Sequence, residues 1–408
     1  MISVLESDVA VLDLLDPAFR PDGPQARAAR AANWYARTPM GIAVLHHDKI
    51  NLLLGDRRLV QGSHRILTAQ GIVSGPVPEF MNSIILTVEG DDHTRLRSLV
   101  SRAFTPRSVA AVRPRIAAVA EELADRLAAA GRGEFMAEFA DPFPARIICE
   151  LLGVPTEQHD AFRTWANDLG LMFSYTARAH LDRIEESLAG LHAATEALIA
   201  ARRADPRADL ITGLIAAEAD GDRLTTRELR LMVAALLFAG QDTTRHQLGL
   251  AMALFERHPD QWALLAERPE LAADAVAEVV RLAPTATGTG RVATRDIEID
   301  GTVIPAGTVL TMLFHAGNTD PAVFGPDADT FDITARRPAP PLSFGAGVHY
   351  CLGANLARAE MSEALPVLAR RLGPLALDGE PTWRPALGIT GPVALPLRFG
   401  APGRAYQP

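Results

Sequence analysis

The feature that most constrains this chain is the segment 344–353, which reads Phe-Gly-Ala-Gly-Val-His-Tyr-Cys-Leu-Gly. It places Cys351 where a glycine-rich loop enters a helix, because residues 354–371 repeat apolar side chains at helical spacing. The positive end of a helix dipole and its unpaired N–H groups stabilise a thiolate at such a position. The glycines let the backbone approach a flat group closely. A thiolate held in this way suits the axial ligand of a haem iron, whereas an isolated cysteine is by default a buried core residue.

Length and composition bound the remaining possibilities. The chain has 408 residues, 48% of them hydrophobic, and shows neither a linker nor a repeat, so we expect one domain over residues 1–408, with residues 1–40 its least constrained segment. The formal net charge of −9 argues against nucleic acid as a partner. Cys149 and Cys351 are the two cysteines, which indicates a reducing compartment. The acidic N-terminus and the shortness of the longest apolar run, 231–240, predict a soluble, cytoplasmic protein without a membrane anchor.

The periodicity of the apolar residues predicts many helices and few strands. Helices are expected over residues 115–130, 185–203, 226–257, 270–282 and 353–371. Strands are expected over residues 41–45, 296–299, 302–304 and 393–399. The fold class is therefore predicted as mainly α with a small β portion, although spacing alone does not name the fold.

Two further motifs carry chemistry. Residues 239–244 read Ala-Gly-Gln-Asp-Thr-Thr inside the apolar helix 226–257, where a glycine costs about 1 kcal/mol relative to alanine. A threonine hydroxyl can also bond the carbonyl four residues earlier and bend the helix. Because apolar residues flank the motif, it predicts a local distortion of the helix rather than a polar patch facing solvent. Glu278 and Arg281 lie three residues apart on a partly apolar helix, where they can form either a buried ion pair or an exposed one.

The segment around Cys351 resembles the haem-binding signature of the cytochrome P450 family, Phe-x-x-Gly-x-x-x-Cys-x-Gly, and fills all four of its fixed positions. The resemblance covers nearly the whole chain from about Gly41 onward. It implies the family's triangular, mainly helical fold, with haem b sandwiched between two helices and Cys351 as the iron ligand. It also implies that Thr243 hydrogen-bonds dioxygen and that Asp242 helps to relay protons to it.

The same resemblance assigns a structural lock behind the haem to Glu278 and Arg281. In the family a basic residue often joins this pair from a later loop. Here Thr330 stands where arginine is usual, so either Arg336 or Arg337 substitutes or the lock has two members.

Four basic residues match family positions that bind the haem propionates, which are carboxylates and need such partners. They are His93, Arg97, Arg291 and His349, of which Arg291 is expected just before a strand. By the same resemblance the haem contacts Ala239, Phe344, Gly345 and Gly353.

Residues 94–115 contain six arginines and no acidic residue. These arginines are Arg95, Arg97, Arg102, Arg107, Arg113 and Arg115. Complementary charge speeds association, so the run is interpreted as a docking site for an acidic electron donor, against the alternative of a solvated helix face. The chain has neither a flavin-type glycine motif nor an iron–sulfur cysteine cluster, so a separate ferredoxin or flavodoxin with its NAD(P)H reductase is expected. A monomer is the default expectation.

These observations predict a monooxygenase that inserts one oxygen atom of O2 into a C–H bond of a hydrophobic or amphipathic small molecule, such as a terpenoid, steroid, fatty acyl chain or polyketide. The alternatives are a non-insertion oxidation such as aryl coupling or desaturation, a peroxide-driven haem enzyme, and a haem-binding sensor or carrier without turnover. The residues expected to line the substrate pocket are Phe80, Ile84, Ile85, Met172, Leu236, Thr287 and Ile389.

Overall fold

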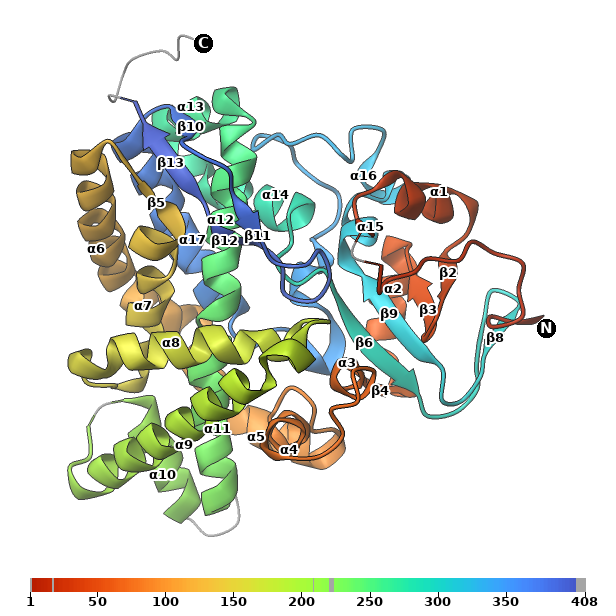
Figure 1. Ribbon diagram of the computed structural model, residues 1–408, viewed down its shortest axis with the longest axis horizontal. Coiled ribbons are helices and arrows are strands. Elements are labelled where there is room, and N and C mark those ends of the chain that lie inside the picture. The colour runs from red at the N-terminus through yellow and green to blue at the C-terminus, as the bar shows by residue number, and fades with distance from the viewer. Residues whose placement is uncertain (1, 17, 208, 220–223, 401–408) are drawn as a thin grey trace.

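The computed structural model describes residues 2–16, 18–207, 209–219 and 224–400 of the chain. Figure 1 shows a body of helices beside a smaller part built on a sheet, with the N-terminus at the outer end of the sheet part. The predicted fold class, mainly α with a small β portion, is confirmed. The single domain over residues 1–408 stays a prediction, and Met1 and residues 401–408 lie outside the described residues.

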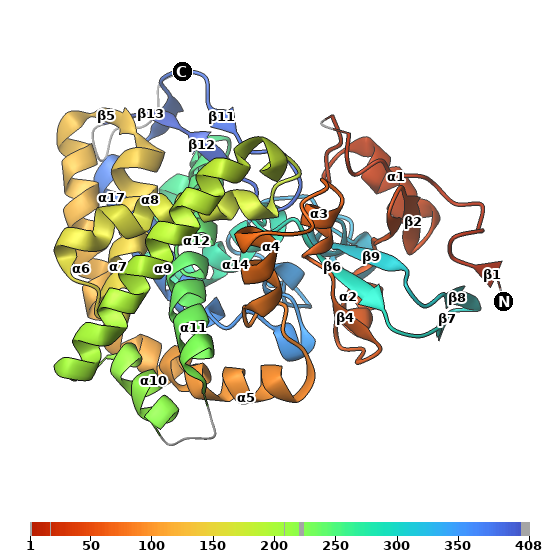
Figure 2. The ribbon, with the colours of Figure 1, turned by 60° about the horizontal axis from the view of Figure 1, so that its bottom comes forward.

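The helices of the body pack around α11 and α12, which run through its centre (Figures 1 and 2). The long helices α6 and α17 pack against each other along one side of the body. The helices are α1 (Pro24–Ala32), α2 (His47–Leu54), α3 (Arg65–Thr68), α4 (Pro76–Ser83), α5 (Gly90–Ser101), α6 (Pro106–Ala130), α7 (Pro142–Leu152), α8 (His159–Leu169), α9 (Leu181–Ala204), α10 (Leu210–Ala219), α11 (Thr226–Ala239), α12 (Asp242–Glu256), α13 (Pro259–Glu267), α14 (Ala272–Leu282), α15 (Phe314–Asn318), α16 (Pro321–Phe324) and α17 (Ala354–Leu372). Among the described residues, no helix is long and apolar enough to cross a membrane.

The largest sheet has the strand order β2–β3–β9–β6–β4, in which β3 and β9 are parallel and the other neighbours antiparallel. Its strands are β2 (Tyr35–Thr38), β3 (Gly41–Val44), β4 (Leu59–Gln61), β6 (Gly288–Ala293) and β9 (Val309–Leu313). The smaller sheets comprise β1 (Ile2–Ser3) with β7 (Ile297–Ile299) and β8 (Thr302–Ile304), then β5 (Arg132–Glu134) with β10 (Leu375–Leu377) and β13 (Pro396–Phe399), and the pair β11 (Thr382–Trp383) and β12 (Pro392–Ala394).

Several predicted elements differ from the structure in their bounds. The helix expected over residues 226–257 is two helices, because Gly240 and Gln241 separate α11 from α12. The helix expected from residue 115 begins at Pro106, where the Thr105 side chain caps it and the missing N–H of a proline in the first turn does no harm. The strand expected over residues 393–399 is divided between β12 and β13.

The position predicted for Arg291, just before a strand, is wrong. Arg291 lies inside β6 and pairs with Leu310 of β9. The run Gly-Thr-Gly-Arg that opens β6 lacks the alternation of apolar and polar residues that indicates a half-buried strand, so the pattern did not predict it.

Candidate active site

A cavity of about 430 Å³ lies where the helical body meets the sheet part. Its walls come from the break between α11 and α12, from segment 343–353, from β6 and from the turn 387–389. These segments lie far apart in the sequence, and the fold brings their side chains to one cavity.

Cys351 lies at the end of the loop that precedes α17, and it lines this cavity. The loop is closed by a hydrogen bond of 2.9 Å from the Cys351 N–H to the Phe344 carbonyl. Gly347 has a φ of +69°, and a Cβ there would collide with the backbone at the end of α2. Burial raises the pKa of the Cys351 thiol, whereas the N–H of Gly353 and the charge of Arg97 lower it. The N–H donors that stabilise a thiolate are therefore in place.

Arg97, which is half-buried, and Arg291, which is buried, both face the cavity. The Arg97 Nη2 donates to the Tyr350 carbonyl at 2.5 Å, and the Arg291 Nη1 donates to the Gln61 Oε1 at 3.0 Å. Among the described residues, no carboxylate forms an ion pair with either guanidinium. Burial lowers the pKa of Arg291 to about 10, so both side chains stay charged at neutral pH. Two such cations suit the carboxylates of a bound group.

His93 and His349 line the same wall of the cavity, and their ring centroids lie 4.3 Å apart. Burial, with the neighbouring His349 and Arg97, lowers the pKa of His93 to about 4, so His93 is neutral at pH 7. His349 Nε2 lies 3.1 Å from Oε1 of Glu89. The fold therefore gathers the four basic residues predicted from the sequence, and it adds an acidic neighbour to His349 that the sequence analysis missed.

The break between α11 and α12 presents Ala239, Gly240 and Thr243 to the cavity. The Thr243 hydroxyl lies 3.4 Å from the Ala239 carbonyl, the oxygen four residues earlier, as expected for a hydroxyl that helps to distort a helix. The distortion predicted at this motif is present.

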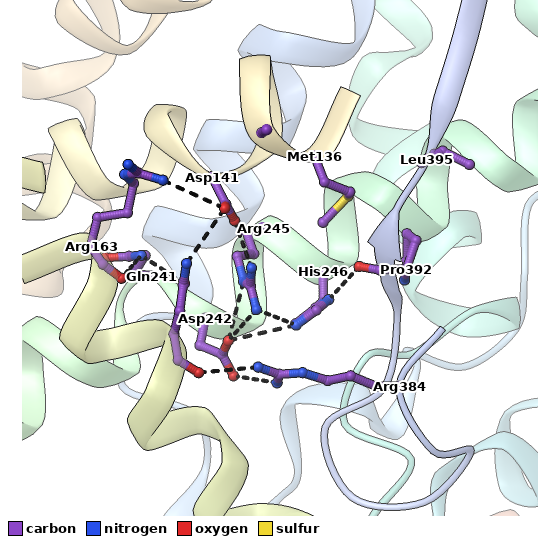
Figure 3. Close-up of polar contacts among 12 residues, drawn as sticks. Met136, Asp141, Arg163, Gln241, Asp242, Arg245, His246, Arg384, Pro392 and Leu395 are labelled. Atoms are coloured by element: carbon purple, nitrogen blue, oxygen red, sulfur yellow. Dashed lines mark hydrogen bonds and ion pairs between the residues drawn. The ribbon is translucent and has the colours of Figure 1, made fainter. Parts of the chain in front are cut away.

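Asp242, in contrast, does not line the cavity. Figure 3 shows its carboxylate between two arginines: the Arg384 Nη1 donates to Oδ2 at 2.9 Å, and the Arg245 Nη2 donates to Oδ1 at 3.1 Å. Burial alone would raise the pKa of Asp242, but the charges of Arg384 and Arg245 overcome it, so that the pKa is lowered. Asp242 is thus a carboxylate held in an internal ion-pair cluster.

A second acid, Glu360 of α17, does line the cavity and is fully buried. Burial raises its pKa well above the usual range, and the neighbouring Thr244 hydroxyl only partly offsets this. Burial therefore favours the neutral form of Glu360. Sequence reasoning missed it, because a single acid in a helical pattern carries no signal of the face that it occupies.

The lock around Glu278 has three members. The Arg281 Nε and Nη2 donate to the two carboxylate oxygens of Glu278 at 2.7 and 2.6 Å, and the Arg337 Nη2 donates to Oε1 at 2.8 Å. Arg337, not Arg336, therefore completes the lock. Thr330 contributes its backbone carbonyl, which accepts hydrogen bonds from both Arg281 and Arg337.

Five of the seven residues predicted for the substrate pocket line the cavity. They are Ile84, Ile85, Leu236, Thr287 and Ile389. The prediction was wrong for Phe80 and Met172, which are buried in the core and absent from the cavity wall. Phe173, the residue after Met172, lines the cavity instead, because the chain there forms a tight helical turn in which adjacent side chains point in different directions.

The arginine run 94–115 is a smaller basic surface than its sequence indicates. Arg95 pairs with Glu228, Arg113 with Glu363 and Arg115 with Glu150. Arg97 faces the cavity. This leaves Arg102 and Arg107, which are exposed and form no ion pair with any described residue.

These residues fit a haem bound through a cysteine thiolate. Cys351 and the N–H groups beside it can supply a thiolate ligand, and the glycine backbone permits close approach of a flat group. The guanidiniums of Arg97 and Arg291 form no ion pair with any described carboxylate, so they can bind the carboxylates of such a group. The family model for cytochrome P450 matches residues 75–373. The chain belongs to the cytochrome P450 family, whose members bind haem through a cysteine thiolate.

Individual relatives give the class of enzyme. Luteothin monooxygenase of Streptomyces thioluteus is 43% identical over 398 residues, which cover 97% of each chain. Mycinamicin IV hydroxylase/epoxidase of Micromonospora griseorubida is 36% identical and aligns over 87% of this chain and 88% of its own length. The crystal structure of CalO2 superposes with a TM-score of 0.88 at 30% identity, covering 97% of this chain and all of that one. This protein is a P450 monooxygenase, an oxidoreductase that incorporates oxygen from O2.

Proposed function

We propose that this chain inserts one oxygen atom of O2 into a C–H bond of a hydrophobic or amphipathic small molecule, with haem b bound through Cys351. The observation that carries the proposal is that Cys351, Thr243 and an apolar wall all face one cavity. When bound, the haem supplies the redox chemistry that activates O2. The chain's own residues bind the substrate, exclude water and deliver protons.

The cavity wall supports an apolar substrate. Ile84, Leu236 and Ile389 lie on three different segments of the chain, and aromatic side chains complete the wall. Threonine is the commonest polar residue of the wall, and a threonine hydroxyl can orient a substrate without the desolvation cost of a charge. Two of the related enzymes are named for luteothin and mycinamicin. We place the substrate of this chain among compounds of terpenoid, steroid, fatty acyl or polyketide type.

Thr243 is proposed to donate a hydrogen bond to dioxygen bound in the cavity. Its hydroxyl faces the cavity at the break between α11 and α12, where a water molecule or a neighbouring acid can replace the proton that it gives up. We assign Asp242 to the same relay. Because Asp242 is ionised and bound by Arg384, it takes up a proton only when that contact loosens.

A separate protein is the proposed source of electrons, namely a ferredoxin or flavodoxin with its NAD(P)H reductase. The segment that follows α5 lies against the first turn of α17, since the Asn355 side chain donates to the Phe104 carbonyl at 3.0 Å. Arg102 and Arg107 are therefore exposed close to the helix that begins beside Cys351. An acidic donor docked there would lie near the thiolate side of the haem. The monomeric state stays a prediction.

The deciding experiment has two stages. The difference spectrum of the reduced protein with carbon monoxide should show the red-shifted Soret band of thiolate ligation in the wild type and lose it in Cys351→Ala; a band typical of histidine ligation in both would overturn the assignment. Turnover under 18O2 should then yield a product carrying one labelled atom. A product that has lost two hydrogens and carries no label would establish desaturation or coupling instead.

A further inference from the structure

The segment between β11 and β12 reaches from the ion-pair cluster to the cavity. Its middle residues, Leu387, Gly388 and Ile389, line the cavity. Its first residue, Arg384, is buried and points the other way, into the cluster around Asp242 (Figure 3). One short segment therefore contributes both to the wall that faces substrate and to the environment of the acid at the helix break.

Both ends of this segment are bound to α12. The Arg384 Nη1 donates to Asp242 at 2.9 Å, and the Arg384 N–H donates to the Gly391 carbonyl at 2.9 Å, which closes the base of the segment. The His246 Nδ1 lies 3.1 Å from the Pro392 carbonyl. The Arg384 Nη2 also reaches the Asn167 carbonyl at 3.3 Å, so this single guanidinium joins the segment to α8 as well as to α12.

The cluster itself is a row of alternating charges. Asp141 pairs with Arg245 at 2.7 Å, Arg245 with Asp242 at 3.1 Å, and Asp242 with Arg384 at 2.9 Å. Arg163 approaches Asp141 at 3.7 Å from the other end. Arg384 is the member that comes from the cavity-lining segment, whereas Arg163 lies on α8 and forms no hydrogen bond or ion pair with that segment among the described residues.

The tip of the segment has anchors of its own. The Gly388 N–H donates to the Thr287 hydroxyl at 3.0 Å, and the Thr390 N–H donates to the Thr285 carbonyl at 2.8 Å. Loss of the Arg384 side chain would therefore detach the base of the segment from Asp242 and Asn167, whereas the backbone hydrogen bond to Gly391 and the anchors at the tip would remain. We expect a change in the shape of the cavity wall rather than unfolding of the segment.

We propose that Arg384 is a positioning residue that sets the placement of the cavity wall 387–389 and ties it to the carboxylate at the helix break. A substrate that displaces this wall would also displace the Arg384 guanidinium and so loosen its ion pair with Asp242. Substrate binding and the freedom of Asp242 to take up a proton are therefore linked. The proposal rests on the proposed function, because it assigns to Arg384 the placement of the molecule that is to be oxygenated.

The test compares two nitrogen heterocycles that bind the haem iron of the holoenzyme, each titrated by the shift of its Soret band. Imidazole is too small to fill the cavity, whereas 4-phenylimidazole carries a second ring that must be accommodated by the cavity wall. Arg384→Gln should weaken 4-phenylimidazole about tenfold and change imidazole by less than about twofold, as expected when a pocket contact is lost. Arg163→Gln, which removes the same charge from the same cluster, should leave both affinities unchanged.

Further outcomes separate positioning from general stability. Arg384→Lys should recover part of the affinity for 4-phenylimidazole, because an ammonium can still reach Asp242 but lacks the fork that also reaches Asn167. If Arg384→Gln does not bind haem, the affinities of Arg384→Lys for the two probes are compared with those of the wild type instead. Equal weakening of the two probes, or equal effects of Arg384→Gln and Arg163→Gln, would overturn the proposal. Failure of the wild type to incorporate 18O would refute the proposed function and leave this binding test standing.

Discussion

Replacement of Arg337 tests the buried lock around Glu278, and the neighbouring residue provides a matched control. Arg337 is 10% exposed and donates to Glu278 at 2.8 Å and to the Thr330 carbonyl at 2.9 Å. It also pairs with the exposed Asp327 at 2.8 Å. Arg336 is exposed and forms no ion pair with any described residue. We expect Arg337→Gln to destabilise the protein and Arg336→Gln to be nearly neutral.

The magnitude follows from the contacts that are lost. A buried hydrogen bond to a charged group contributes about 1.5–3 kcal/mol, whereas a surface ion pair contributes at most about 1 kcal/mol. Glu278 keeps both of its bonds to Arg281, so it does not become an unpaired buried charge, which would cost about 3–5 kcal/mol. The free energy of unfolding should therefore fall by about 2–3 kcal/mol for Arg337→Gln and by less than about 0.5 kcal/mol for Arg336→Gln.

Urea unfolding of the holoenzyme, followed by far-ultraviolet circular dichroism and by Soret absorbance, measures the difference. With a slope of about 3 kcal/mol per molar urea, the midpoint should fall by about 0.7–1 M for Arg337→Gln. Arg337→Lys should lie between the two variants, because it keeps the charge and loses the bidentate geometry. Equal midpoints for Arg336→Gln and Arg337→Gln would refute the assignment of Arg337 to the lock.

Three further predictions concern protons, electrons and pH. Thr243→Ala should divert electrons from product to hydrogen peroxide by about tenfold or more, measured per NAD(P)H consumed, and tight coupling in that variant would contradict the role of Thr243. Reversing the charges of Arg102 and Arg107 to glutamate should slow reduction by a ferredoxin and leave substrate binding unchanged; a wild-type reduction rate that is independent of salt concentration would argue against docking there. Hydrogen bonds from Arg95 lower the pKa of Glu228 from 4.5 to about 2, so the stability that Glu228 contributes is present above pH 4.5 and is lost as the pH falls toward 2. Solvent screening limits this contribution to about 1 kcal/mol, and Glu228→Gln should therefore lose less stability than the wild type between about pH 6 and about pH 3 in urea unfolding; an equal loss would exclude the linkage.

Local patterns account for the parts of the site that were predicted correctly. The glycines around Cys351 and the helix that follows lie within about thirty residues of one another, so the loop that places Cys351 just before α17 could be predicted from the chain. The break at residues 240–241 was likewise indicated by a glycine and two threonines in an apolar helix. The predicted pocket residues were less reliable, as Phe80 and Met172 show, because an apolar side chain beside a cavity and one in the core look alike in a sequence.

The sequence by itself predicted Cys351 as the iron ligand and determined the fold class and the position of the helix break, because each depends on residues that are close together along the chain. Tertiary structure alone decided which arginine completes the lock around Glu278 and that Arg384 forms an ion pair with Asp242. Arg337 lies 59 residues after Glu278, and Arg384 lies 142 residues after Asp242. No periodic or local sequence pattern identifies an ion-pair partner at such a separation. The pairing depends on which buried carboxylate the folded chain brings within hydrogen-bonding distance of the arginine.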